Sequence, residues 1–552
     1  MLHNFKINKK YTKPVAYFSM EFAIHQPLKI YSGGLGFLAG SHMRSCYDLK
    51  QNLVGVGMLW KLGYYDQKRL YDGSLGVDFR LKFQNFLKDT GVTVKVPFMG
   101  REVVVKVWKL EPDTFETAPI LLLSTDTEEN IPEDRAITNK LYDDNKVIRM
   151  GQYIVLGIGG AKALEALGFA PEIYHLNEAH PLPVAFWLLN KYKGKLAEVK
   201  KRLVFTTHTP EDAGNERSDF DLIQKSGFLA GVDPKSITHL WKSDEGVFNH
   251  TLVGLRMAKI SNAVSKIHGD VSREMWKDYE GICDITHITN AQNKRFWVDP
   301  ILEKALKHDD DELLMSRKRE LKVALLQEVE DQTGKVLDPD ALTIVWARRF
   351  AGYKRADLIL SDIERFKKIA SNSKHPVQVI WAGKPYPLDF GAIDVFNSIH
   401  KKTLDIPNCT ILIGYELRLS RLMKQGSDLW LNNPRYSREA SGTSGMTAAM
   451  NASINFSVDD GWVPEFAKDG KNSFIIPHLD HHLPVEVQDK HDVEALYDIL
   501  ENTIVPMYYK KRDKWVKIIK HSMTDVAPQF DSDRMADEYY ANIYNAPDAN
   551  LI

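Results

Sequence analysis

The chain has 552 residues, which is enough for two or three domains with full hydrophobic cores. Its 72 Lys and Arg residues balance 73 Asp and Glu residues, which argues against a general nucleic-acid or membrane-surface binder. The sequence has no run of about 18 apolar residues, so no transmembrane helix is expected. The lysine-rich start lacks the apolar core of a secretory signal. Three isolated cysteines, Cys46, Cys283 and Cys409, disfavour a disulfide framework or a Cys-based zinc site, so we expect a cytoplasmic protein.

Short β-rich runs alternate with longer amphipathic stretches along the chain. This repetition predicts an α/β protein with parallel sheets, in which ligands bind on the loops beyond the carboxyl ends of strands. A domain break is expected near 284–300, a charged helical segment at 299–334, and a helical carboxyl end at 493–544. The predicted strands are 14–18, 120–124, 202–206, 342–346, 377–381 and 410–413, and the predicted helices include 37–49, 146–167 and 356–370.

A glycine-rich turn precedes the first predicted helix. The segment from Ser32 to Gly36 reads Ser-Gly-Gly-Leu-Gly. Glycines allow a ligand to approach the backbone closely, and the start of a helix offers free N–H groups to a phosphate. Such turns are also common for structural reasons, and by itself this segment leaves both interpretations open.

Four cations follow the predicted strand at 342–346. The segment from Arg348 to Arg355 reads Arg-Arg-Phe-Ala-Gly-Tyr-Lys-Arg. Arg349 and Lys354 lie five residues apart around a glycine, so both can bind one phosphate. A solvated, basic helix start is the structural alternative.

A third motif runs from Asn432 to Met446 and is rich in small residues and hydroxyls after Glu439. Its backbone amides can bind sugar hydroxyls or phosphate oxygens, and the Glu439 carboxylate can accept hydrogen bonds from a vicinal diol. A plain loop is the alternative, but a carboxylate placed just before the Ser/Thr/Gly run favours a ligand.

Two histidine segments follow predicted strands. One runs from His175 to His180 and contains Glu178, and the other contains His208. A zinc site is the tempting interpretation of Glu178 and His180, yet two residues on one loop seldom bind zinc without further ligands. Sugar binding or a structural role is favoured, and no metal is expected.

Together these segments resemble the α-glucan (glycogen) phosphorylases of the short bacterial type. The matches appear in family order from about residue 14 to residue 544. They are Tyr17–Phe22, Ile30–Gly36, Asn177–His180, Thr207–Pro210, Arg348–Arg355 and Glu439–Met446.

The resemblance implies a GT-B architecture, in which two Rossmann-like domains face an interdomain cleft and a carboxyl-terminal helix crosses back to the first domain. The expected domains are 1–287 on the glucan side, 288–525 with the donor phosphate site, and 526–552 as the crossover helix. Phosphorylase relatives are commonly dimers, so a homodimer is possible.

The resemblance also implies roles for individual residues. Arg349 and Lys354 would hold the donor phosphate, and Glu439 and the His208 carbonyl would hold glucose hydroxyls. The remaining expected contacts to substrate are Gly34, Leu35, His180, Asn290, Thr443, Ser444 and Gly445.

One position departs from the family pattern. The phosphorylases carry pyridoxal phosphate as a Schiff base on the lysine that follows Gly-Met in the third motif, and here that residue is Thr447. A hydroxyl cannot form an imine, so this link is excluded at Thr447. Lys424 and Lys468 lie well outside the motif and offer no obvious substitute. The usual Thr-Asn-Gly is also altered, to Thr289-Asn290-Ala291.

In related nucleotide-sugar enzymes of this architecture, the diphosphate of the donor occupies the space that the phosphate of pyridoxal phosphate occupies in the phosphorylases. These enzymes often have a Glu-x7-Glu motif, whose last residue faces the ribose of the donor. In this chain the first position of that motif is Glu439 and the last is Thr447. We therefore expect a PLP-independent, retaining α-glucosyltransferase with a nucleotide-glucose donor and an α-glucan or small sugar acceptor. A phosphorylase with non-covalent pyridoxal phosphate is the second hypothesis, and a non-catalytic glucan-binding relative is the third. The base of the nucleotide and the acceptor length stay open.

Overall fold

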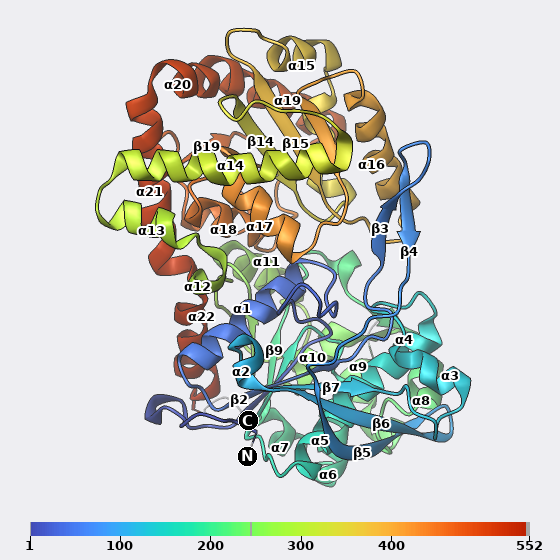
Figure 1. The fold of residues 1–552 in the computed structure, drawn as a ribbon. Coiled ribbons are helices and arrows are strands. Elements are labelled where there is room, and N and C mark those ends of the chain that lie inside the picture. Colours follow the sequence, from blue (N-terminus) through green and yellow to red (C-terminus); the bar gives the residue numbers. More distant parts are fainter. Residues whose placement is uncertain (1, 243–245, 548–552) are drawn as a thin grey trace. The chain divides into compact units, whose positions relative to one another are not determined.

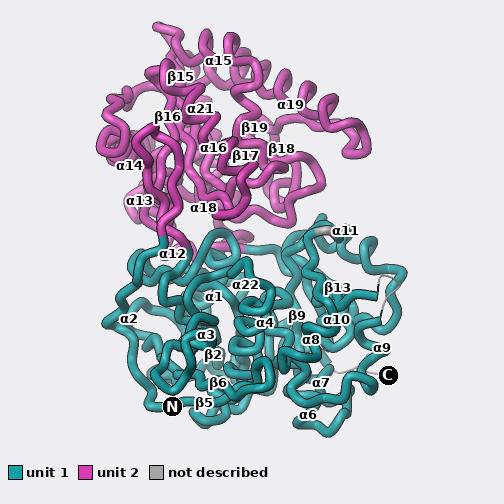
Figure 2. The backbone as a smooth tube through the Cα atoms, turned by 90° about the vertical axis from the view of Figure 1, so that its right-hand side faces the viewer, with its two compact units in different colours: residues 1–64, 79–290, 532–552 teal, residues 65–78, 291–531 magenta. Residues whose placement is uncertain are grey.

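The computed structural model describes residues 2–242 and 246–547, which form two compact units. Unit 1 contains the described residues up to Tyr64, residues 79–290, and the segment from Ser532 on. Unit 2 contains Tyr65–Asp78 and Ala291–Asp531 (Figure 2). Each unit is built on its own sheet, with helices as labelled in Figure 1.

Unit 1 is built on a nine-stranded sheet. Seven strands run parallel, and β6 and β5 complete one edge in antiparallel pairing. The central strands are buried apolar runs, which is typical of a sheet covered on both faces. In spatial order the strands are β13 (Ile285–His287), β12 (Ile260–Ala263), β9 (Leu203–Thr206), β8 (Ile173–Asn177), β1 (Val15–Phe18), β2 (Leu53–Met58), β7 (Ile120–Ser124), β6 (Arg101–Leu110) and β5 (Lys88–Phe98).

The helices of unit 1 follow the parallel strands in the chain. The segment from Ser532 on joins this unit. Ser532 Oγ, at the start of α22, lies 2.6 Å from Ser45 Oγ of α1, and Tyr544 OH, in the π-helical turn Tyr539–Tyr544 after α22, lies 2.7 Å from His175 Nδ1 of β8. The longer helices are α1 (Gly34–Asp48), α4 (Lys146–Ile154), α5 (Gly160–Ala166), α6 (Pro183–Lys191), α8 (Phe220–Ser226), α10 (His250–Met257), α11 (Lys266–Trp276) and α22 (Ser532–Glu538).

Unit 2 is built on a six-stranded sheet whose strands are all parallel. The spatial order is β16 (Cys409–Leu412), β15 (Val377–Ala382), β14 (Leu342–Ala347), β17 (Leu429–Asn432), β18 (Ile454–Val458) and β19 (Ser473–Ile476). Numbered along the chain, this is the order 3-2-1-4-5-6 of the doubly wound fold. The order reverses between β14 and β17, and this point is where such folds bind ligands.

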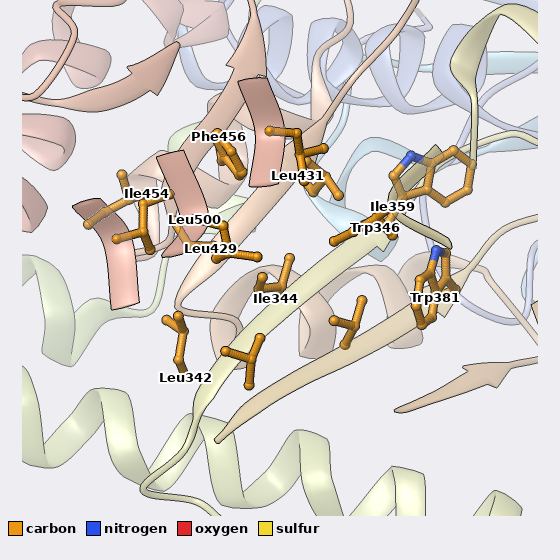
Figure 3. Packing of buried hydrophobic residues seen from close by; sticks show 14 of the residues in the cluster. Leu342, Ile344, Trp346, Ile359, Trp381, Leu429, Leu431, Ile454, Phe456 and Leu500 are labelled. Atoms are coloured by element: carbon orange, nitrogen blue, oxygen red, sulfur yellow. The ribbon is translucent and has the colours of Figure 1, made fainter. Parts of the chain in front are cut away.

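The core of unit 2 packs against the faces of this sheet. Leu342, Ile344 and Trp346 alternate along β14 and belong to one buried cluster with side chains of β15, β17 and β18 (Figure 3). Full burial of each such side chain contributes about 1.5–3 kcal/mol, so the position of β14, and of the loop that follows it, is strongly determined by packing.

The helices of unit 2 include the long, charged α14, which the 299–334 pattern predicts. Asp310 caps its start by accepting from Leu313 N (2.9 Å), and Gly334 ends it in the left-handed conformation. The helices are α12 (Lys294–Trp297), α13 (Pro300–Lys307), α14 (Asp311–Thr333), α15 (Ile363–Ala370), α16 (Phe390–Thr403), α17 (Leu417–Gly426), α18 (Ser444–Met450), α19 (Val485–Ile499), α20 (Val505–Lys510) and α21 (Arg512–Phe530).

A hairpin from the amino-terminal part of the chain belongs to unit 2. Its strands are β3 (Asp66–Arg69) and β4 (Leu75–Asp78). The Gln67 amide donates to Gly383 O (2.8 Å), and its oxygen accepts from the backbone N–H groups of Gly414 (2.9 Å) and Tyr415 (3.2 Å). The hairpin therefore satisfies backbone groups that follow β15 and β16.

The predicted α/β class with parallel sheets is confirmed by these two sheets. The single helix expected over 356–370 is wrong. Arg355 has a φ of 49°, and only a short 3-10 turn at Leu358–Leu360 precedes α15. The Arg355 side chain instead donates to the carbonyl groups of Asn433 (3.0 Å) and Pro434 (2.9 Å), which holds this segment in irregular backbone.

None of the helices in the described residues combines the length and the hydrophobicity that a membrane crossing requires. All three cysteines carry free thiols.

Candidate functional site

The motif residues of unit 2 lie on the loops that follow β14 and β17, the two strands at which the strand order reverses. The loop after β14 carries Arg348, Arg349 and Lys354, and the loop after β17 carries Glu439. Because parallel strands present their carboxyl ends at one edge of the sheet, these loops meet there.

Glu439 lies between two buried cations. Its carboxylate accepts from Arg348 Nη2 and from Lys354 Nζ, which is 3.2 Å from Oε1 and 3.1 Å from Oε2. All three side chains are buried. Because one carboxylate compensates two cations, the cluster has a net positive charge, as an anion site requires.

The charges of this cluster act on one another. Burial opposes ionisation of Glu439, yet Arg348 and Lys354 together lower its pKa to about 2. Burial and the neighbouring Arg348 lower the pKa of Lys354 to about 7. At neutral pH Glu439 is therefore ionised, while Lys354 gives up its proton far more easily than an exposed lysine does.

Unused polar atoms lie in the same cluster. Arg348 Nη1 and Ser441 Oγ are buried, and neither has a hydrogen-bond partner among the residues that the structure describes. Gly442, with a φ of 81°, keeps the backbone close to Arg348, because a Cβ there would lie 3.4 Å from Arg348 Nη2. Since buried polar atoms are rarely left unpaired, these two are available to a ligand.

Asp460 ties the loops after β17 and β18 together. Its carboxylate accepts from the backbone N–H groups of Arg438 (3.1 Å), Glu439 (3.0 Å) and Gly461 (2.8 Å). Burial raises the pKa of Asp460 to about 7, and the Glu439 charge adds to the effect.

The other expected residues of unit 2 have different surroundings. Arg349 is exposed and lies beside Tyr353. Thr443 caps α18 without a side-chain hydrogen bond to the helix, and Ser444 Oγ accepts from Trp430 Nε1 (3.3 Å). Gly445 has a packing role, because a Cβ there would lie 2.4 Å from Asn455 Oδ1.

Thr447 is fully buried in α18, and its hydroxyl donates to Ser444 O (3.0 Å). Helix α17, which contacts α18, carries Lys424 near its carboxyl end. Lys424 Nζ is 3.7 Å from the ring centroid of Trp297, and Asn451 Nδ2 donates both to Trp297 O (3.1 Å) and to Thr447 O (2.8 Å). Burial, followed by the charge of Arg421, lowers the pKa of Lys424 well below its ordinary value.

In unit 1 the glycine-rich turn is held by a buried carboxylate. Glu21 follows β1 and accepts from Ser32 N (2.6 Å), Ser32 Oγ (2.8 Å), Gly33 N (3.2 Å) and Tyr142 OH (2.6 Å). A Cβ at Gly34 would meet nothing within 4 Å, whereas one at Gly36 would lie 2.6 Å from Tyr31 Cβ. Leu35 follows as the second residue of α1. The glycine at 34 is therefore not required by its own surroundings.

Glu178 and His208 lie together on the loops after β8 and β9. The Glu178 carboxylate accepts from His208 N, and His208 Nε2 lies 2.7 Å from Asn177 Oδ1. Burial raises the pKa of Glu178 to about 7, and Glu178 has a left-handed φ of 72°. Strained backbone of this kind is concentrated at functional sites.

His180 and Asn290 complete the expected residues of unit 1. The His180 ring lies 5.4 Å from the Tyr153 ring, and its Nδ1 has no hydrogen-bond partner among residues 2–242 and 246–547. Within the same described ranges, the buried Asn290 Oδ1 also has none, although Asn290 N donates to Val264 O (3.0 Å). Both atoms are free to contact a ligand.

Four residues take part in these clusters although their sequence context predicts no role for them, namely Arg348, Asp460, Glu21 and Glu178. Arg348 belongs to the cationic motif from Arg348 to Arg355, but residue type and spacing do not distinguish which of two adjacent arginines is buried. Among the described residues, one group brings three possible metal-binding side chains within 4.8 Å, namely the exposed Asp480, His481 and His482. That no metal takes part stays a prediction.

The chain is also similar in sequence to known proteins. Residues 290–476 match the sequence profile of the family described as carbohydrate phosphorylase. The chain is 46% identical over 533 residues to an uncharacterized protein of Methanocaldococcus jannaschii, covering 96% of this chain and 100% of that protein. It is 33% identical to maltodextrin phosphorylase of Thermococcus litoralis, covering 98% of this chain and 72% of the relative. It is also 33% identical to glycogen phosphorylase of Aquifex aeolicus, with 98% and 87% covered.

Proposed function

Because the chain belongs to the carbohydrate phosphorylase family, we propose that it transfers glucosyl units to an α-glucan or small sugar from a nucleotide-glucose donor. In this proposal the two units are the Rossmann-like domains of a GT-B glycosyltransferase. Cytoplasmic location and a homodimer stay predictions from the sequence.

One observation carries the choice of donor. Arg348, Lys354 and Glu439 form a buried cluster with excess positive charge, whereas position 447 has a threonine hydroxyl that is bonded within its own helix. The cluster suits the phosphate of a donor. Thr447 cannot bind an aldehyde covalently, so pyridoxal phosphate does not fit at this position as a Schiff base.

The proposed reaction is a displacement on one face of the sugar. The bond between glucose C1 and the donor phosphate breaks, the bond between C1 and the acceptor oxygen forms, and the acceptor proton goes to the departing phosphate. Arg348, Arg349 and Lys354 stabilise the developing negative charge as fixed cations. Glu439 exchanges part of its contact with these cations for glucose hydroxyls, and the resemblance to the phosphorylases implies that the His208 carbonyl also accepts from a glucose hydroxyl.

The test is donor turnover by purified protein with a short α-glucan present. UDP-glucose, ADP-glucose and other nucleotide-glucoses are supplied one at a time, and release of nucleoside diphosphate is measured. A parallel reaction contains orthophosphate and glucan, and glucose 1-phosphate is measured. Consumption of a nucleotide-glucose supports the proposal. Release of glucose 1-phosphate with no nucleotide-glucose consumed refutes it.

Phosphorolysis is the second candidate, and Lys424 is the observation that favours it. An amine whose pKa is lowered by burial and by a neighbouring cation is a good nucleophile for an aldehyde. Lys424 lies over the Trp297 ring, and Asn451 donates to the carbonyl groups of Trp297 and Thr447, so a buried amine and position 447 share neighbouring residues.

A direct measurement separates covalent from non-covalent binding. The protein is incubated with pyridoxal phosphate, reduced with borohydride, digested and analysed by mass spectrometry. A pyridoxyl mass on the Lys424 peptide, absent in Lys424→Met, indicates a covalent site. Cofactor absorbance that is lost on dialysis indicates non-covalent binding. Glucan binding without turnover of any donor supports a non-catalytic relative.

A further inference from the structure

We propose that Asp460 is a positioning residue that holds Glu439 between Arg348 and Lys354 and so controls whether the site is assembled. The inference rests on the proposed function in one respect, namely that the Glu439 cluster binds the glucosyl donor. Asp460 itself is 1% exposed and would not touch the substrate.

The geometry makes Asp460 the junction of two loops. Its Oδ2 accepts from the N–H groups of Arg438 and Glu439, so it fixes the backbone at Glu439 itself. Its Oδ1 accepts from Gly461 N (2.8 Å). Gly461 has a φ of 64°, and a Cβ there would lie 2.3 Å from Ser441 O. Trp462 N also donates to Ser441 O (3.1 Å), so the two loops are tied on both sides of Glu439.

The loop that carries Glu439 needs such an anchor. Between β17 and α18 it is irregular, and Ser437 has a φ of 70°, which is unfavourable for a residue other than glycine. Arg438 N also makes a turn hydrogen bond to Arg435 O (3.3 Å), and the Asp460 carboxylate adds the bonds to the N–H groups of Arg438 and Glu439, while the cations bind the Glu439 side chain.

The charges around Asp460 make its ionisation sensitive to pH. The Glu439 carboxylate acts on Asp460, and Arg348 and Lys354 are bound to that carboxylate. Tyr436 approaches from the same loop. Asp459 precedes Asp460 in the chain, and His478, after β19, faces Asp459. With the pKa of Asp460 raised to about 7, the carboxylate is protonated below neutral pH. A protonated oxygen no longer accepts from an amide, so one tie of the loop is lost.

The first experiment is the pH dependence of kcat/KM, measured with the donor that the wild-type protein uses. Wild-type kcat/KM should fall on the acid side as Asp460 is protonated and on the alkaline side as Lys354 loses its proton, so with both pKa values at about 7 it should be highest near pH 7. In Asp460→Asn the amide NH2 faces backbone donors and nothing titrates at this position, so kcat/KM should fall at least tenfold at pH 7 and lose its acid limb. Asp459→Asn, the matched control, should keep both limbs. An unchanged acid limb in Asp460→Asn overturns the inference.

A second readout does not need turnover. Hydrogen exchange of peptides that span 436–446 should be faster in Asp460→Asn than in the wild type or Asp459→Asn at pH 8. After correction for intrinsic rates, the wild-type peptides should exchange faster at pH 6 than at pH 8, while peptides from β14 do not change. This wild-type comparison stands even if Asp460→Asn fails to fold. Equal exchange at both pH values refutes the role of Asp460. A wild-type protein that uses no donor, yet shows this exchange, refutes the proposed function alone.

Discussion

Replacing Glu439 by glutamine tests the charge balance of the cluster most directly. The change keeps the size of the side chain but removes the anion that Arg348 and Lys354 share. Removing one member of a buried ion pair costs about 3–5 kcal/mol, since it leaves an uncompensated buried charge. Here Arg348 and Lys354 both lose their anionic partner, but only Lys354 can become neutral by releasing its proton.

The pH dependence of this loss follows from Lys354. Its folded-state pKa of about 7 lies below its ordinary value of 10.5, so the unfolded state binds more protons between these values and stability rises with pH in this window. Without Glu439 the folded-state pKa of Lys354 falls further, so the pH range in which stability rises with pH extends below pH 7. Glu439→Gln should therefore lose more stability at pH 6 than at pH 8. A difference of one pKa unit corresponds to about 1.4 kcal/mol.

The assay is thermal and guanidinium unfolding of the wild type and the variant at pH 6 and pH 8. Asp299→Asn is the control, because the buried Asp299 binds Arg317 (2.7 Å), which cannot lose its proton in this range, and Asn still caps α13. This control should lose the same stability at both pH values. An equal loss for Glu439→Gln at pH 6 and pH 8 would refute the assignment of Lys354 as the titrating cation.

Three further predictions concern unit 1. Tyr544→Phe should cost about 1–3 kcal/mol and lower Tm, because the buried His175 Nδ1 loses its partner at 2.7 Å, and no change in Tm contradicts this. Gly36→Ala should lower Tm, because the added methyl group would clash with Tyr31 Cβ. Gly34→Ala should leave Tm unchanged but weaken binding of the donor or glucan, because its methyl group meets no protein atom. Equal Tm values for the two variants would be inconsistent with this geometry. Glu21→Gln should raise KM about tenfold, because the N–H groups of Ser32 and Gly33 lose a charged acceptor. Hydrogen exchange over residues 30–36 should become faster in this variant. An unchanged KM argues against a ligand at this turn.

The sequence predicts the strands well where burial determines them. β7 and β14 are apolar on both faces, and their expected positions agree with the structure to within one residue. The helix expected over 356–370 failed because the side chain of Arg355 bonds to carbonyl groups about 80 positions away, which no local pattern records. Tertiary contacts override local propensity in such a segment.

The candidate site also combines features that the local sequence records with features that depend on tertiary contacts. Glycine, cation and carboxylate motifs at strand ends were recognisable, because residue type and spacing carry that information. The pairing of Glu439 with Arg348 and the role of Asp460 depend on distances between loops. Lys424 is 23 positions from Thr447 in the chain, and only the packing of α17, α12 and α18 brings them into one neighbourhood.

The hairpin of β3 and β4 has a consequence for how this protein is made. The chain passes from one unit to the other at 64/65, 78/79, 290/291 and 531/532. Neither unit is thus a single stretch of polypeptide, and unit 1 lacks α22 until the ribosome has passed residue 532, after all of unit 2 has been synthesised. A gene fragment ending at residue 290 would encode a hairpin without its sheet and a sheet without Tyr539 and Tyr544. Cutting the gene between the units should yield aggregation rather than two stable halves, whereas co-expressed fragments could still complement each other.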